Sequence, residues 1–294
     1  MMDITDEIEG GELGSFADDT KAWQITTSMF IQRELGKMYK WAEKNNSEFN
    51  GKKFVKVTYG DPLDDTIFLA PDGTRIASKT NTRDLGVEMS ADAKFDIHIN
   101  NIVRGTQKMS AWTLRTFRTR KTGPMLTIWT TLVRGKVEYA SFLWSPTDAA
   151  NFRNLEKLQR RFTSKFAQVR SYNQNKGYTE CKVNYWERLQ SLKMYSLQRK
   201  RERYVLCYIF KIHAGMVPDL GFLSDTGKQG LKYFAKENHQ ATKKVQDMRR
   251  SSFFTQGPLL YNLMPMMLRE TVTLSTTAKE AKDKREKFKK WLDR

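Results

Sequence analysis

Cysteine is almost absent from this sequence, because the 294 residues include only Cys181 and Cys207. Two cysteines cannot staple a chain of this size, so we expect a reducing, intracellular location, nucleus or cytoplasm. No apolar run approaches the ~18 residues that a transmembrane helix needs, and we expect no membrane partner. The first 20 residues hold seven acidic and no basic residues, which is the reverse of the start of a signal peptide.

Several common site signatures are also missing. The sequence has no Walker-type Gly-rich loop and no G-x-G-x-x-G motif. Its three histidines (His98, His213 and His239) and two cysteines do not have the spacing of a zinc site. The sequence therefore gives no sign of a P-loop, a dinucleotide-binding motif or a structural zinc.

Positive charge is abundant. The chain has 51 Lys and Arg against 33 Asp and Glu, a net charge of +18 and an isoelectric point near 9.8. A basic body of this size attracts polyanions, and nucleic acid is the leading candidate. With 7 Trp, 17 Phe and 11 Tyr, the chain can also bury a core.

The order of patterns predicts an α+β chain. We expect a small antiparallel sheet with helices in the N-terminal part, and a mostly α-helical remainder after about Ser90. Short strands are predicted at 13–23, 53–60, 67–70, 74–77 and 85–87, with a turn at Pro71-Asp72-Gly73. Helices are predicted over 27–45, 92–120 and 125–133, from 148 to 166, from 184 to near 215, and over 276–294.

An acid pair lies between two apolar segments. Residues 13–23 are typical of strand, tight turn and strand, with Asp18 and Asp19 at the tip. Two carboxylates there can face a cleft and hold Mg²⁺ through oxygen. An ordinary exposed turn explains the dipeptide alone more simply, and Asp64-Asp65 is a second acid pair that we interpret as loop.

Two basic clusters with neighbouring aromatic residues are candidates for phosphate contacts. One comprises Arg115, Arg118, Arg120 and Lys121 beside Trp112 and Phe117; the other comprises Arg199, Lys200, Arg201 and Arg203 beside Tyr204. The aromatic residues of the first cluster are more often part of a core, and a solvated helix face explains the second cluster about as well.

The segment Phe16-Ala17-Asp18-Asp19-Thr20-Lys21 resembles the F-A-D-D catalytic box of reverse transcriptases from jockey-type non-LTR retrotransposons. Further blocks resemble that family in the family's order. They are Trp41 to Lys53, Val57-Thr58-Tyr59-Gly60, Gly73-Thr74-Arg75-Ile76, Arg83-Asp84-Leu85-Gly86-Val87, His98 to Ile102, Leu132 to Pro146, Glu156 to Thr163, Arg188 to Ile212, and Ser252 to Pro265.

The resemblance implies a partial palm over 1–90, a helical thumb-like region over 91–175 and a basic C-terminal region over 176–294. It implies that Asp18 binds metal directly, that Asp19 supports the same site, and that Lys53 protonates pyrophosphate. Two Mg²⁺ ions would serve the intact enzyme. Its partners would be an RNA template, a DNA primer and deoxynucleoside triphosphates. Residues 67–77, with Arg75, would steady the primer, and basic helices that include Arg160 and Arg161 would follow the hybrid backbone.

The chain also departs from the family pattern. In the family another metal-binding aspartate and the fingers lie upstream of the F-A-D-D box, and only 17 residues precede Asp18 here. We therefore expect a C-terminal part of an RNA-directed DNA polymerase that is inactive by itself. Two alternatives stay open: a non-catalytic nucleic-acid-binding remnant, and a decayed gene product without a settled function.

Overall fold

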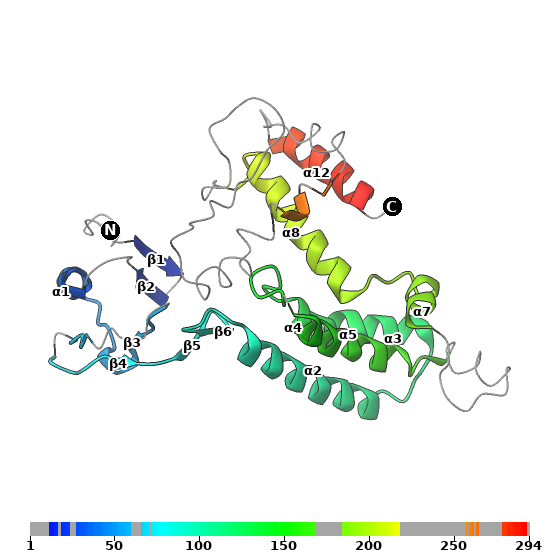
Figure 1. The fold of residues 1–294 in the computed structure, drawn as a ribbon, viewed down its shortest axis with the longest axis horizontal. Coiled ribbons are helices and arrows are strands. Elements are labelled where there is room, and N and C mark those ends of the chain that lie inside the picture. Colours follow the sequence, from blue (N-terminus) through cyan, green and yellow to red (C-terminus); the bar gives the residue numbers. More distant parts are fainter. Residues whose placement is uncertain are drawn as a thin grey trace. The chain divides into compact units, whose positions relative to one another are not determined.

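The computed structural model describes residues 12–16, 19–23, 28–59, 66–70, 72–146, 148–167, 184–217, 257, 259–261, 263–264 and 278–292. The chain divides into two compact units, Met1–Ala93 and Lys94–Arg294. Short strands occur in the first unit, and the described part of the second is helical, which confirms the α+β fold class (Figure 1). The predicted roles of 1–90, 91–175 and 176–294 stay predictions.

Among the described residues of the first unit, the strands form three separate pairs instead of the one antiparallel sheet that we expected. β1 (Glu12–Phe16) and β2 (Asp19–Trp23) are antiparallel, as are β5 (Asn81–Asp84) and β6 (Val87–Ser90). β3 (Val55–Lys56) and β4 (Ala77–Ser78) are parallel. Pairs this short cannot bury a sheet face of their own, so the apolar side chains gather against a helix instead.

That helix is α1 (Ser28–Lys44), and its apolar face forms the core of the first unit. Leu35, Met38 and Ala42 are buried at the spacing that the sequence predicted. Leu35 and Met38 share a cluster with Phe68, Ala70 and Ile76 of the chain around the 71–73 turn. Around it pack partly buried aromatic side chains: Tyr39, Trp41, Phe49 and Phe54.

Two turns show where the sequence was informative and where it was not. At the predicted turn, Gly73 has a φ of +79° and its N–H donates to the Ala70 carbonyl at 2.9 Å. The predicted strand at 85–87 is wrong for its first two residues, because Leu85 and Gly86 have positive φ and form the turn that joins β5 to β6, whereas Val87 begins β6. An apolar Leu beside Val87 imitates a strand, but Gly86 allows the tight turn.

The second unit is built from helices. They are α2 (Asp96–Thr116), α3 (Thr122–Ile128), the π-helical η3 (Trp129–Val133), α4 (Arg134–Glu138), α5 (Ala149–Thr163), α7 (Tyr185–Ser191), α8 (Leu197–His213) and α12 (Ala278–Leu292). α2 packs along α5 and α4 (Figure 1). The fully buried side chains between them include Trp129, Val133, Leu155 and Phe162.

One of the predicted helices is two separate helices in the structure. We expected a continuous helix from Asn184 to near Gly215, but α7 ends at Ser191 and α8 begins at Leu197. Lys193 has a φ of +51°, which stops α7, and the Ser196 hydroxyl accepts the Arg199 N–H to start α8. Leu189, Leu192 and Leu197 are buried on both sides of the break, so their apolar spacing alone does not reveal it.

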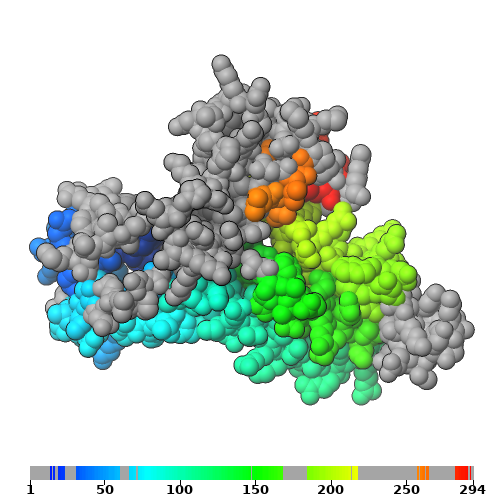
Figure 2. Space-filling view, viewed as in Figure 1, coloured from blue at the N-terminus to red at the C-terminus, as the bar shows by residue number. Residues whose placement is uncertain are grey.

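The C-terminal part of the second unit has its own apolar cluster. Phe210 of α8 stacks on Phe288 of α12 with ring centroids 4.9 Å apart. Tyr261 and Met264 join this cluster, and in Figure 2 their segment (orange) lies against α8 (yellow). The predictions for Asp18, for Asp64-Asp65 and for most of the block from Ser252 to Pro265 fall outside the described residues.

Candidate functional site

The acid-bearing hairpin has the predicted form. Phe16 pairs with Asp19 and Ser15 with Thr20, so Ala17 and Asp18 connect the two strands but lie outside the described residues. Asp19 is exposed and is the first residue of β2. On the same strand, Lys21 Nζ lies 2.5 Å from Asp84 Oδ1 at the end of β5. This ion pair connects two hairpins that are about 60 residues apart in the sequence.

The donor chemistry at this hairpin fits Mg²⁺. An exposed carboxylate such as that of Asp19 supplies the hard oxygen ligand that the ion prefers, and Asp18 would add a second. Among the residues that the structure describes, no three His, Cys, Asp or Glu side chains gather into a metal-binding group. The pair Asp18 and Asp19 therefore stays a proposed metal site.

The other predicted site residues of the first unit are exposed. Lys53 is the last residue of the 3-10 helix η2 (Gly51–Lys53), and Arg75 forms an antiparallel bridge with Leu69. Hydrogen bonds from Thr74, and the nearby Lys52 charge to a smaller degree, lower the pKa of Asp72. Of the adjacent lysines Lys52 and Lys53, Lys52 is the one whose charge lowers the pKa of Asp72.

An exposed cationic face runs along α5. Arg160 and Arg161 are both exposed, as predicted for backbone contacts, and Arg153 and Lys157 are exposed beside them. We call these four residues the α5 face. They fall within an arc of roughly 100° on the helix, and none makes an ion pair with a described residue. Sequence reasoning missed Arg153 and Lys157, although their four-residue spacing to Arg161 is a visible signal.

A second cationic stripe lies on α2. Arg115 is exposed, and Lys108 and Arg104, about two and three turns earlier, are exposed on the same side. We call Arg104, Lys108, Trp112 and Arg115 the α2 stripe. The single acidic residue of this helix, Asp96, is in its first turn, where it accepts a hydrogen bond from Asn151 at 2.7 Å. Nothing within the helix therefore neutralises the stripe.

Arg120 has a structural role, in contrast to its predicted neighbours. Its guanidinium donates to the carbonyls of Leu114 at 2.7 Å and Thr119 at 2.8 Å, and so satisfies groups at the end of α2. Arg118 and Lys121, on either side, are exposed. Within this basic cluster, Arg120 is therefore used for hydrogen bonds inside the protein and is no longer a candidate for phosphate contact.

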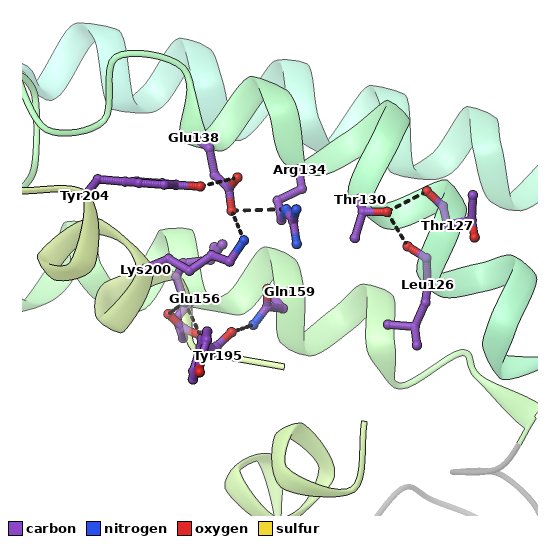
Figure 3. A network of polar contacts seen from close by, with 11 residues as sticks. Leu126, Thr127, Thr130, Arg134, Glu138, Glu156, Gln159, Tyr195, Lys200 and Tyr204 are labelled. Atoms are coloured by element: carbon purple, nitrogen blue, oxygen red, sulfur yellow. Dashed lines mark hydrogen bonds and ion pairs between the residues drawn. The ribbon is translucent and has the colours of Figure 1, made fainter. Parts of the chain in front are cut away.

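Lys200 is also engaged inside the protein. Its Nζ lies 3.1 Å from Glu138 Oε1, which is 3.1 Å from Arg134 Nε, while the Tyr204 hydroxyl donates to Glu138 Oε2 at 2.9 Å (Figure 3). Burial lowers the pKa of Lys200, and the Glu138 charge opposes that shift. Lys200 therefore fixes α8 to α4.

Arg201 is the clearest correction. Its side chain is only 3% exposed, and the guanidinium lies over Trp144 at 5.7 Å and Phe152 at 5.9 Å. Its three side-chain nitrogens have no hydrogen-bond partner among the described residues. Burial lowers the pKa of Arg201 to about 10. A side chain in this position cannot reach a nucleic-acid backbone.

The remaining members of the 199–203 cluster differ in exposure. Arg199 is exposed and its guanidinium lies 4.9 Å from the centre of the Tyr195 ring, whereas Arg203 is half-buried. Most of the basic side chains of residues 199–203 thus make contacts inside the protein. Exposed cations remain on the α5 face, on the α2 stripe and at Arg118 and Lys121. Among them, the Arg160 guanidinium lies 4.8 Å from the centre of the Tyr185 ring.

A polar network holds the α5 face in place. Glu156 accepts a hydrogen bond from the Tyr185 hydroxyl and another from the Leu197 N–H at 3.1 Å. Gln159 donates to the Tyr185 hydroxyl at 3.0 Å and to the Tyr195 carbonyl at 2.9 Å; Figure 3 shows the Gln159–Tyr195 contact. Burial, and then the Glu156 charge, raise the pKa of Tyr185. α5, α7 and α8 are therefore fixed to one another beneath the exposed cations.

Comparisons of the chain with protein-family models, curated proteins and solved structures find no match. No described helix is both long and apolar enough to span a membrane.

Proposed function

We propose that this chain acts in RNA-directed DNA polymerisation of the non-LTR retrotransposon type and that its second unit holds the template–primer. The observation that carries the proposal is the hairpin that places Phe16 opposite Asp19, at the segment whose sequence resembles the F-A-D-D box. The ordered sequence blocks after that box support the same family. The exposed cations of the second unit support a polyanionic partner.

The residues have separate roles in this proposal. Asp18 and Asp19 would hold Mg²⁺ through their carboxylate oxygens, and an ion bound there would supply charge stabilisation for the primer hydroxyl and the leaving pyrophosphate. Lys53, exposed on η2, donates a proton to that pyrophosphate. Arg75 and the turn beside it steady the primer end. The α5 face binds phosphates without reading sequence.

Primer extension tests the catalytic part. The full chain is incubated with an RNA template, a DNA primer, Mg²⁺ and deoxynucleoside triphosphates, beside the variant Asp18→Asn. Extension that disappears in the variant supports nucleotidyl transfer at this hairpin and contradicts the expectation that the chain is inactive by itself. No extension by the folded wild type is the result that this expectation predicts, and it leaves binding as the activity of this chain. Extension that persists in Asp18→Asn contradicts nucleotidyl transfer at this hairpin, and a circular-dichroism melt of both proteins shows that each is folded.

A second candidate function is nucleic-acid binding without catalysis, and the α5 face favours it because that face requires no metal. Under this alternative the folded wild-type chain binds an RNA–DNA hybrid but does not extend a primer. Affinity falls steeply as salt rises, and Asp18→Asn binds as tightly as the wild type. If the chain does not bind at low salt, both candidate functions fail.

A further inference from the structure

The α2 stripe differs from the α5 face in containing an exposed aromatic ring. Trp112 is 48% exposed, one turn after Lys108 and one turn before Arg115. On α5 itself, by contrast, Phe162 is buried and Phe152 lies under Arg201, so the exposed residues of this helix are cations without an exposed ring among them. The exposed ring near this face belongs to Trp186 of α7, which contacts the Tyr185 ring that Arg160 covers. The two surfaces therefore suit different ligands.

The ring of Trp112 is held in place and remains accessible. Phe117 meets it edge-on, with centroids 6.4 Å apart and planes at 88°. The opposite side of α2 is anchored by buried Ile99, Thr106 and Thr113, so the stripe points away from the core. A rigid, exposed aromatic ring is a ready surface for stacking.

The cations around Trp112 extend along the helix on both sides of the ring. Arg104 and Arg115 are eleven residues apart, or about 16 Å along the helix, with Lys108 between them. An unpaired strand offers free base faces beside its phosphates, and aromatic side chains flanked by cations are the usual means of binding it. A paired hybrid hides those base faces, and a protein partner would not require three uncompensated cations.

We propose that the α2 stripe binds unpaired nucleic acid, with Trp112 stacking on a base and Arg104, Lys108 and Arg115 contacting phosphates. This inference rests on the proposed function and adds to it a site for single strands, such as unpaired template. The α5 face then serves the paired backbone. Recognition is independent of sequence, because every base has a stacking face.

Fluorescence anisotropy with the full chain and three labelled probes tests this site. The probes are a single-stranded RNA, a blunt RNA–DNA hybrid of equal length and an abasic strand with the same number of phosphates. Trp112→Leu keeps apolar bulk but removes the aromatic face. We expect it to weaken single-strand binding by about tenfold, while its affinities for the hybrid and the abasic strand change by less than about twofold.

Two further variants separate stacking from other effects. Trp112→Phe keeps an aromatic face and should retain most of the single-strand affinity. Trp186→Ala removes a tryptophan that is 55% exposed on α7, outside the stripe and beside the α5 face, and should leave single-strand binding unchanged. The inference is overturned if Trp112→Leu binds single strands normally, if it loses hybrid binding equally, or if Trp186→Ala has the same effect. In those cases hybrid binding by the wild type still supports the proposed function, whereas no binding of any probe overturns both.

Discussion

At the scale of the residue, the side chains around Glu138 should make the protein sensitive to alkali. Burial and then the Glu138 charge raise the pKa of Tyr204 to about 12. Between pH 10 and 12 the unfolded chain releases this proton first, so rising pH favours unfolding. Because Tyr204 is half-exposed, we expect the effect to be about 1 kcal/mol.

Tyr204→Phe should therefore lose less stability than the wild type between pH 10 and 12. Urea unfolding at several pH values measures the difference. The lowered pKa of Lys200 acts in the opposite direction up to its ordinary value, because stability then rises with pH. The tyrosines Tyr39, Tyr59 and Tyr185 also have raised pKa values. In the variant they therefore still cause part of the fall in the free energy of unfolding with rising pH. If the free energy of unfolding fell equally with pH in both proteins, the role assigned to Tyr204 would be contradicted.

Arg201 offers a second test at this scale. A buried cation without hydrogen-bond partners in the described structure carries a desolvation cost, and an apolar residue of similar volume avoids it. We expect Arg201→Met to raise the free energy of unfolding by roughly 1–3 kcal/mol and to leave the affinity for hybrid unchanged. Chemical denaturation and anisotropy measure the two quantities. If Arg201→Met lost as much affinity for hybrid as Arg161→Gln, Arg201 would contact phosphates and its assignment to the interior would be wrong.

At the scale of the element, regular local patterns were predictable. The apolar spacing of α1 and the start of α5 were visible in the sequence, and the Asp148 side chain does accept the Asn151 N–H at 2.7 Å. The break at Lys193 was not visible, because a backbone conformation outside the helical region leaves the apolar spacing intact. Nor could sequence separate Arg161 from Arg201, since exposure depends on which helices pack together.

The α5 face gives the prediction at this scale. Replacing Arg153, Lys157 and Arg161 with Gln removes three exposed cations from one helix. We expect the affinity for hybrid at low salt to fall at least about tenfold, and the slope of log affinity against log salt to fall by about two to three. A matched variant with Lys282, Lys287 and Lys290 of α12 changed to Gln has the same net charge. If that variant loses as much affinity and slope, total charge rather than the α5 face explains binding.

At the scale of the whole molecule, the two compact units divide the proposed work. Asp18 and Asp19 belong to the first unit, and the α5 face and the α2 stripe belong to the second. Each unit has its own buried cluster, one around Leu35 and another around Phe210. This division could not be read from the +18 charge, which the sequence spreads over most of its length.

Damage to one core should therefore separate the two activities. Leu35→Ala removes a side chain that is 6% exposed in the first unit, and Leu155→Ala one that is 0% exposed in the second. Each should destabilise its own unit by about 2–5 kcal/mol. Amide hydrogen exchange read by mass spectrometry should show faster exchange confined to residues 28–93 in Leu35→Ala. That variant should keep its affinity for hybrid within about twofold, whereas Leu155→Ala should weaken it. Faster exchange throughout the chain in Leu35→Ala, together with loss of binding, would show instead that the two units fold and bind as one.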